Sequence, residues 1–206
     1  MYLVKTPDIV QSLWPSFLWR VPTQERILYL TFDDGPIPEI TPWVLDMLKA
    51  FEAKATFFCV GENVLRYPDI YQRILTEGHS TGNHTHNHLN GWKTSTLDYL
   101  RNVRRCARLV RSNLFRPPYG RLSPCQHASL ERFYTIVLWD VLSGDFDQNV
   151  DAQQCLSNIL ENAVEGSIIV LHDNIKTADK IRFVLPELLR YFTQQGYRFE
   201  GLPSSR

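Results

Sequence analysis

Two adjacent carboxylates are the first residues of this chain whose types and spacing suit chemistry. Asp33 and Asp34 follow the apolar run 27–30, within the stretch Thr-Phe-Asp-Asp-Gly-Pro at 31–36. Two carboxylates at the end of a buried strand are costly unless a partner or a metal ion neutralises one of them. Alone, the pair is equally consistent with ordinary turn chemistry, so its interpretation depends on the rest of the chain.

A histidine cluster provides that context, because four of the six histidines lie between residues 79 and 88. His84 and His88 are four residues apart, the spacing that places two ligands on one helix face, and His86 would then point elsewhere. Two imidazoles and the Asp34 carboxylate leave coordination positions open, which is typical of a catalytic metal site. The alternative is a polar loop that is merely rich in histidine.

Hydrolysis at such a metal needs a base and an acid as well as a water whose pKa is lowered to around 7. We expect Asp33 to be the base, and Arg116 to hold it ionised. His172 follows the apolar run 168–171 and is the expected acid, provided that a carboxylate such as Asp145 keeps it protonated. Taken singly, Arg116 also fits a turn-anchoring surface arginine, and a histidine such as His172 is more commonly a buried residue satisfied by hydrogen bonds.

The elements that must position these residues alternate along the chain. Apolar patterns predict strands at 27–30, 55–60, 79–83, 115–120, 134–139, 167–171 and 197–199. Amphipathic patterns predict helices at 41–51, 68–77, 96–114, 123–132, 151–164 and 177–195, with Thr41 as an N-cap. This order implies an α/β fold with a parallel sheet, either doubly wound or closed as a shortened (β/α) barrel. In both folds the functional residues lie at the carboxyl ends of the strands.

Length and composition limit the possible functions. The 206 residues fit one large domain, which we divide into an N-terminal cap segment, 1–25, and a catalytic domain, 26–206. The 22 basic and 22 acidic residues balance, so bulk charge gives no support for a nucleic-acid partner. The four cysteines are scattered, and neither a signal peptide nor a membrane-spanning run is visible. These features predict a cytoplasmic protein with no integral membrane segment, and they leave the oligomeric state open.

Five motifs in order make the chain resemble the polysaccharide deacetylase family, the NodB homology domains of carbohydrate esterase family 4. The resemblance runs from about residue 26 to about residue 200. The motifs are Thr-Phe-Asp-Asp-Gly at 31–35, His-Thr-His-Asn-His at 84–88, Arg-Pro-Pro-Tyr-Gly at 116–120, Asp-Phe at 145–146 and Leu-His at 171–172.

The resemblance implies a distorted (β/α) barrel, a divalent metal that is commonly zinc, and removal of N- or O-acetyl groups from sugars. It assigns Asp33 as the base, Asp34, His84 and His88 as metal ligands, Arg116 as the residue that orients Asp33, His172 as the acid and Asp145 as the residue that tunes it. It also implies that the backbone N–H of Tyr119 binds the oxyanion and that Leu171 lines the acetyl pocket. Phe146 stands where the family usually has a tryptophan in the wall of the groove. Asp140 is a second candidate for tuning His172.

The favoured interpretation is therefore a metal-dependent hydrolase that removes acetyl groups, chiefly N-acetyl groups, from a carbohydrate. One alternative on the same scaffold is hydrolysis of a small cyclic or linear amide. A groove lined by exposed aromatic residues favours the sugar, and a closed pocket with extra positive charge favours the small amide. From other classes, two histidines and one aspartate also suit a non-haem iron oxygenase, and a non-catalytic sugar-binding module is the fourth possibility.

Overall fold

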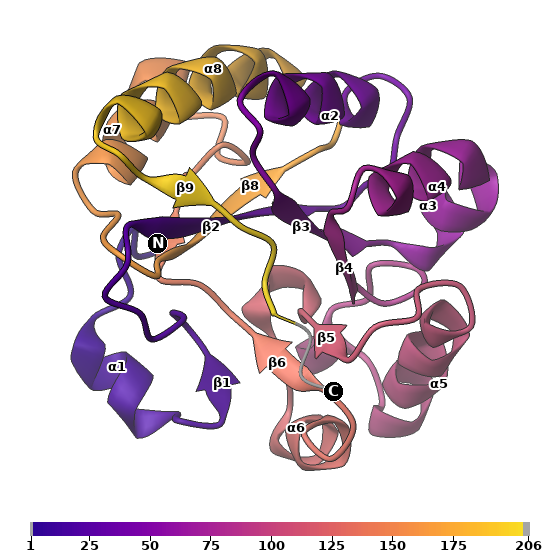
Figure 1. Cartoon of the computed structure of the whole chain (residues 1–206). Coiled ribbons are helices and arrows are strands. Elements are labelled where there is room, and N and C mark those ends of the chain that lie inside the picture. Colours follow the sequence, from indigo (N-terminus) through magenta and orange to yellow (C-terminus); the bar gives the residue numbers. More distant parts are fainter. Residues whose placement is uncertain (1, 204–206) are drawn as a thin grey trace.

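The structure, a computed structural model, describes residues 2–203, and within them nine strands form one curled sheet with the main helices outside it (Figure 1). The strands are β1 (Phe17–Leu18), β2 (Ile27–Asp33), β3 (Ala55–Cys59), β4 (Ser80–Asn83), β5 (Leu114–Phe115), β6 (Thr135–Val137), β7 (Val141–Leu142), β8 (Ile168–His172) and β9 (Arg198–Phe199). The helices are α1 (Asp8–Leu13), α2 (Thr41–Ala50), α3 (Gly61–Arg66), α4 (Pro68–Thr76), α5 (Thr96–Ala107), α6 (Pro124–Leu130), α7 (Ala152–Leu160) and α8 (Ala178–Gln194), with 3₁₀ turns at Gly91–Lys93 and Pro118–Gly120.

The strand order is β1-β6-β5-β4-β3-β2-β8-β7, with β9 beside β2, and the paired strands run parallel. The N-terminal segment runs along the far edge, where the Leu142 N–H donates to the Val4 carbonyl at 2.8 Å and Lys5 bridges Val141 in antiparallel register. The parallel sheet curls into a distorted barrel with helices outside it (Figure 1), and the predicted α/β fold class is confirmed.

The central strand β2 shows how the two faces of the sheet differ. Leu28, Leu30 and Phe32 face outward and join the large apolar cluster that includes residues of α2, α7 and α8. Ile27 and Tyr29 face inward, where they pack with residues of β3, β5, β6 and β8. Because successive side chains of a strand alternate, the inward face continues towards the carboxyl end with polar residues.

Most predicted elements are present, but some differ. The helix predicted over 96–114 ends at Ala107, and the strands β1 and β7 and the helix α3 were not predicted. Thr41 is the first residue of α2 and not its N-cap, which is Ile40. The Thr41 oxygen accepts instead from the Ile37 N–H at 2.9 Å, and its hydroxyl donates to the Asp173 carboxylate at 2.5 Å. The group that would have capped the helix therefore serves other contacts.

The division into a cap segment, 1–25, and a domain, 26–206, stays a prediction. The N-terminal segment supplies β1, which pairs with β6, and its Tyr2 ring lies 5.0 Å from the Phe146 ring. Among residues 2–203, no helix is both long and apolar enough to cross a membrane.

Candidate active site and metal centre

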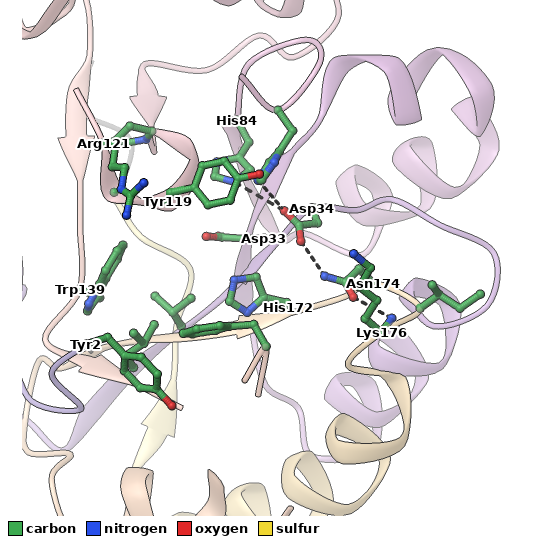
Figure 2. A pocket seen from close by; sticks show the side chains of 17 residues that line it. Tyr2, Asp33, Asp34, His84, Tyr119, Arg121, Trp139, His172, Asn174 and Lys176 are labelled. Carbon is green, nitrogen blue, oxygen red and sulfur yellow. Dashed lines mark hydrogen bonds and ion pairs between the residues drawn. The ribbon is translucent and has the colours of Figure 1, made fainter. Parts of the chain in front are cut away.

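Four of the polar residues predicted from the sequence lie together at the carboxyl ends of the strands in Figure 2: Asp33, Asp34, His84 and His172. Asp33 and His172 are register partners at the ends of β2 and β8. Asp34 follows β2, His84 follows β4 and Arg116 follows β5. A parallel sheet brings all these strand ends to one edge, so residues far apart in sequence share one cleft.

Asp34, His84 and His88 form a cluster that is able to hold a metal ion, with their ligand atoms all within 4.8 Å of one another. Asp34 Oδ1 lies 3.1 Å from His88 Nε2 and 3.7 Å from His84 Nε2. This buried oxygen has no hydrogen-bond partner among the described residues, although a ring nitrogen of each histidine lies close to it. Buried polar atoms are nearly always paired, so an open carboxylate oxygen facing two imidazoles fits a cation.

The hydrogen bonding of His84 also suits a metal ligand. Its Nδ1 lies 2.7 Å from the Arg116 carbonyl, which only accepts, so Nδ1 carries the proton and Nε2 keeps its lone pair. Burial lowers the pKa of His84 to about 4, which keeps the ring neutral. Burial alone would raise the pKa of Asp34, but the close approach of His88 and the charge of His172 outweigh it and hold that pKa well below its usual range.

The loop that carries the two histidines is not helical, so the prediction of a shared helix face is wrong. Thr85 and His88 have φ angles of 62° and 53°, and Asp34 opposite them has φ 86°. Left-handed backbone is unfavourable for residues with a side chain and persists where the surrounding structure enforces it. The turn of the loop, and not a four-residue helical repeat, brings both imidazoles to Asp34.

Two other residues of the histidine cluster lie away from the metal ligands. His79 lies just before the amino end of β4, far from the cleft at the carboxyl end. Its Nδ1 accepts from the Ala55 N–H at 3.2 Å, and its ring packs on Phe57. His86 points away as predicted and is buried close to Gly61. The histidine count therefore overestimated the number of metal ligands, since of the four clustered histidines only His84 and His88 belong to the metal-binding cluster.

Asp33 is paired with a fully buried arginine inside the barrel. Arg116 Nη1 donates to Asp33 Oδ1 and to the Thr31 hydroxyl, each at 2.7 Å, and Nη2 donates to the Leu138 carbonyl at 2.9 Å. The guanidinium also lies over the Phe58 ring, 4.2 Å from its centroid. These contacts fix the position of the Asp33 carboxylate beside the metal cluster.

His172 is held by Asp145 through both its ring and its backbone. Nδ1 lies 2.7 Å from Asp145 Oδ1, and the His172 N–H donates to Asp145 Oδ2 at 2.8 Å. Burial would lower the pKa of His172, but the charge and hydrogen bond of Asp145 outweigh it and raise that pKa to about 10. Asp140, the second candidate, binds Lys5, Gln11 and Ser167 instead.

The ligands open into a cleft of about 660 Å³. Aromatic side chains form much of its wall, and Tyr119 and Phe146 are 60% and 43% exposed. Phe146 packs its ring 5.5 Å from the His172 ring. Tyr119 has φ 61° and stacks edge-on against His88 at 4.8 Å.

The prediction that Leu171 lines the acetyl pocket is wrong. Leu171 is fully buried in the outer apolar cluster, whereas Val170 lines the cleft. The reason is the alternation along β8, which places residues 170 and 172 on one face and residue 171 on the other.

Several residues that line the cleft were not predicted. They are Tyr2, Arg121, Trp139, Leu142, Val170, Asn174, Ile175 and Lys176. Trp139 and Asn174 follow strands β6 and β8, so the rule that placed the other site residues at strand ends would have found them. Tyr2 has no such signal, because it reaches the cleft from the far edge of the barrel.

A parallel barrel with a metal-binding cluster, a buried Asp–Arg pair and a buried Asp–His pair at its carboxyl edge defines a hydrolase-type active site. The sequence model of the polysaccharide deacetylase family matches residues 20–132. A peptidoglycan-N-acetylglucosamine deacetylase of Bacillus cereus is 37% identical over 188 residues, which cover 88% of each chain. A chitooligosaccharide deacetylase of Azorhizobium caulinodans is 30% identical over 207 residues, covering 89% of this chain and 96% of the relative.

A solved structure gives the same result. The crystal structure of the peptidoglycan N-acetylglucosamine deacetylase Bc1960, in complex with 4-naphthalen-1-yl-N-oxidanyl-benzamide, superposes with a TM-score of 0.84 at 32% identity, covering 96% of this chain and 95% of that one. The chain belongs to the polysaccharide deacetylase family. It is a carbohydrate deacetylase, so the predictions of family, fold and enzyme class are confirmed, and the family's dependence on a divalent metal matches the Asp-His-His cluster.

Proposed function

We propose that the protein hydrolyses the N-acetyl group of an amino sugar in a glycan, with a metal ion held by Asp34, His84 and His88. The observation that carries the proposal is the buried Asp34 Oδ1, which has no hydrogen-bond partner in the described chain and faces two imidazole nitrogens. Two histidines and one carboxylate with open positions suit zinc, which we propose as the metal. When bound, it would polarise the acetyl carbonyl and lower the pKa of the attacking water.

Asp33 acts as the base in this proposal. Arg116 occupies Oδ1 of Asp33, which leaves Oδ2 as the oxygen for the proton of the attacking water. The water oxygen forms the new bond to the acetyl carbon. Because Arg116 is fully buried and its donors are directed to fixed acceptors, the carboxylate cannot turn away from the cleft.

His172 acts as the acid. Its Nδ1 is bound to Asp145, so the Nε2 proton is the one available to the cleft. That proton goes to the amine nitrogen as the carbon–nitrogen bond breaks, and acetate and the free amine leave. The pKa of about 10 keeps His172 protonated at neutral pH, as an acid requires.

The oxyanion and the acetyl methyl group have separate partners. The Tyr119 N–H, in its left-handed turn beside His88, is the proposed donor to the oxyanion. Val170 and Leu142, which line the cleft next to His172, replace Leu171 as the apolar wall for the methyl group.

The open, aromatic cleft favours a sugar over a small amide, because exposed aromatic faces suit the apolar faces of sugar rings. Arg121 and Lys176 also line the cleft, and Figure 2 places them on opposite sides of Asp33 and Asp34. Neither side chain forms an ion pair with a described residue, and the Arg121 guanidinium lies 4.9 Å from the centroid of the Trp92 ring. We therefore propose a peptidoglycan glycan, which carries carboxylates, as the substrate in preference to a neutral chitooligosaccharide.

Acetate release by the zinc-reconstituted protein tests the function and the substrate together. We expect release from both peptidoglycan and chitooligosaccharide, with a higher kcat/KM for peptidoglycan that falls as salt is added. Arg121→Gln should reduce the preference, whereas the exposed Arg132→Gln serves as the matched control. No acetate from any acetylated glycan would overturn the function, and an equal kcat/KM for both glycans would overturn only the substrate. The cytoplasmic location stays a prediction from the sequence.

A further inference from the structure

Asp34 is held on its second oxygen by a residue outside the five sequence motifs. The Asn174 side-chain amide donates from Nδ2 to Asp34 Oδ2 at 2.6 Å (Figure 2). We propose that Asn174 is a positioning residue, which turns the Asp34 carboxylate so that Oδ1 alone is presented to the metal. This inference rests on the proposed metal site and adds a determinant of its affinity.

The orientation of the Asn174 amide is fixed by its own loop. Its Oδ1 accepts from the backbone N–H groups of Lys176 and Thr177 at 2.9 and 3.2 Å. Because backbone N–H groups only donate, the oxygen must face them and the NH₂ group must face Asp34. Asn174 therefore connects the turn that follows β8 to the carboxylate that follows β2.

The backbone around Asp34 is held from two further directions. Asn63 on α3 donates to the Asp34 carbonyl at 2.8 Å, and the Asp173 carboxylate accepts from the Gly35 N–H at 3.0 Å. The left-handed Asp34 backbone, with φ 86°, is maintained by such contacts. Among them, Asn174 touches the carboxylate itself, so it governs the rotation of the ligand and not only the position of the chain.

Loss of the hydrogen bond between Asn174 and Asp34 should weaken metal binding. Without a donor on Oδ2, the carboxylate rotates more freely and the arrangement of Oδ1 opposite His84 and His88 is no longer pre-formed. Removing a hydrogen-bond partner of a metal ligand typically weakens metal affinity by about 10- to 100-fold. The same change leaves the apolar cores untouched, so it should alter metal binding more than folding.

Asn174→Ser tests the proposal, because serine keeps an acceptor for the turn but does not reach Asp34. The zinc dissociation constant is measured by competition with a chelator of known affinity, and thermal unfolding of the metal-free protein is measured alongside. We expect the dissociation constant to rise about 10- to 100-fold with little change in unfolding. Asn149→Ser, an exposed asparagine in another loop, is the matched control and should bind zinc like the wild type.

A second pair of variants separates the possible failures. Asn174→Ala removes the turn acceptor as well, so it should weaken zinc binding to a similar degree and unfold at a lower temperature than Asn174→Ser. His84→Ala must lose zinc if the metal site is assigned correctly. If Asn174→Ser binds zinc like the wild type and His84→Ala does not bind it, the role of Asn174 alone would be overturned. If His84→Ala binds zinc like the wild type, the metal site itself would be overturned.

Discussion

Two carboxylates, Asp34 and Asp140, follow barrel strands and carry buried oxygens, yet their surroundings differ. Asp140 is fully buried and accepts hydrogen bonds from Lys5 Nζ at 2.6 Å, Ser167 Oγ at 2.5 Å and Gln11 Nε2 at 3.0 Å. Asp34 accepts from Asn174 on one oxygen, whereas the other has no hydrogen-bond partner and faces two imidazoles. A carboxylate whose acceptors are filled by the protein stabilises the fold, whereas one left open beside two imidazoles is suited to bind something else.

The largest effect is expected when one of the two histidine ligands beside Asp34 is removed. His84→Ala or His88→Ala should weaken zinc affinity by more than about 100-fold, the upper value expected when a hydrogen-bond partner of a ligand is removed. Activity should disappear with the metal. Metal content per chain and acetate release are measured on the same preparation. Full metal content with normal turnover in either variant would contradict the ligand assignment.

The next prediction separates the two neighbouring carboxylates. Asp33→Asn should lower the free energy of unfolding, because Arg116 loses its counter-ion. The folded variant should nevertheless keep the metal and show a kcat about 10²- to 10⁴-fold lower, because the change removes a base and not a ligand. Asp34→Asn should weaken metal binding itself. Zinc titrations and kcat for both variants check this, and the opposite pattern would mean that the two roles are exchanged.

A smaller effect is expected at the Asp145–His172 pair, through the pH dependence. Asp145 raises the pKa of His172, so His172 stays protonated until the pH nears about 10, and its contribution to stability is likewise lost as the pH rises towards that value. Asp145→Asn should move the alkaline limb of kcat/KM to lower pH, and at pH 8 the rate should fall to about a thirtieth as the His172 pKa returns to its ordinary value of about 6.5. An unmoved alkaline limb would show that Asp145 does not control the acid.

The smallest effect on activity is expected at Asp140. Asp140→Asn weakens a buried network whose other members stay in place, so the free energy of unfolding should fall by about 1–3 kcal/mol. Zinc affinity and kcat should stay close to those of the wild type. Denaturant unfolding beside zinc titration tests this, and a loss of zinc without a loss of stability would remove the contrast between Asp140 and Asp34.

The sequence predicted the site where residue type and strand end coincide. Asp33 and His172 end apolar strands, and Asp34 and Arg116 come directly after apolar strands. Parallel topology alone brings such positions together. The sequence could also have predicted that Val170 lines the cleft, because residues two apart on a strand share a face and His172 faces the cleft.

The remaining features depend on contacts that no local pattern encodes. His84 and His88 were paired by a helical spacing, but left-handed loop residues bring them together. Asp140 and Asp145 both lie after β6 and before β8, whose last residue is His172, so the sequence offers both as partners of that ring. Only the fold shows that Asp145 binds the ring and that Lys5 binds Asp140. Lys5 belongs to a segment more than one hundred residues earlier in the chain.

The buried Asp33–Arg116 pair has an evolutionary consequence. Removing the Asp33 carboxylate would leave a guanidinium without its counter-ion inside the barrel, which is strongly destabilising. A descendant that had lost its activity would therefore still be selected against losing either residue alone, simply to remain folded. The unsatisfied Asp34 oxygen has no such protection, so its replacement would be an early mark of a relative that has ceased to be an enzyme.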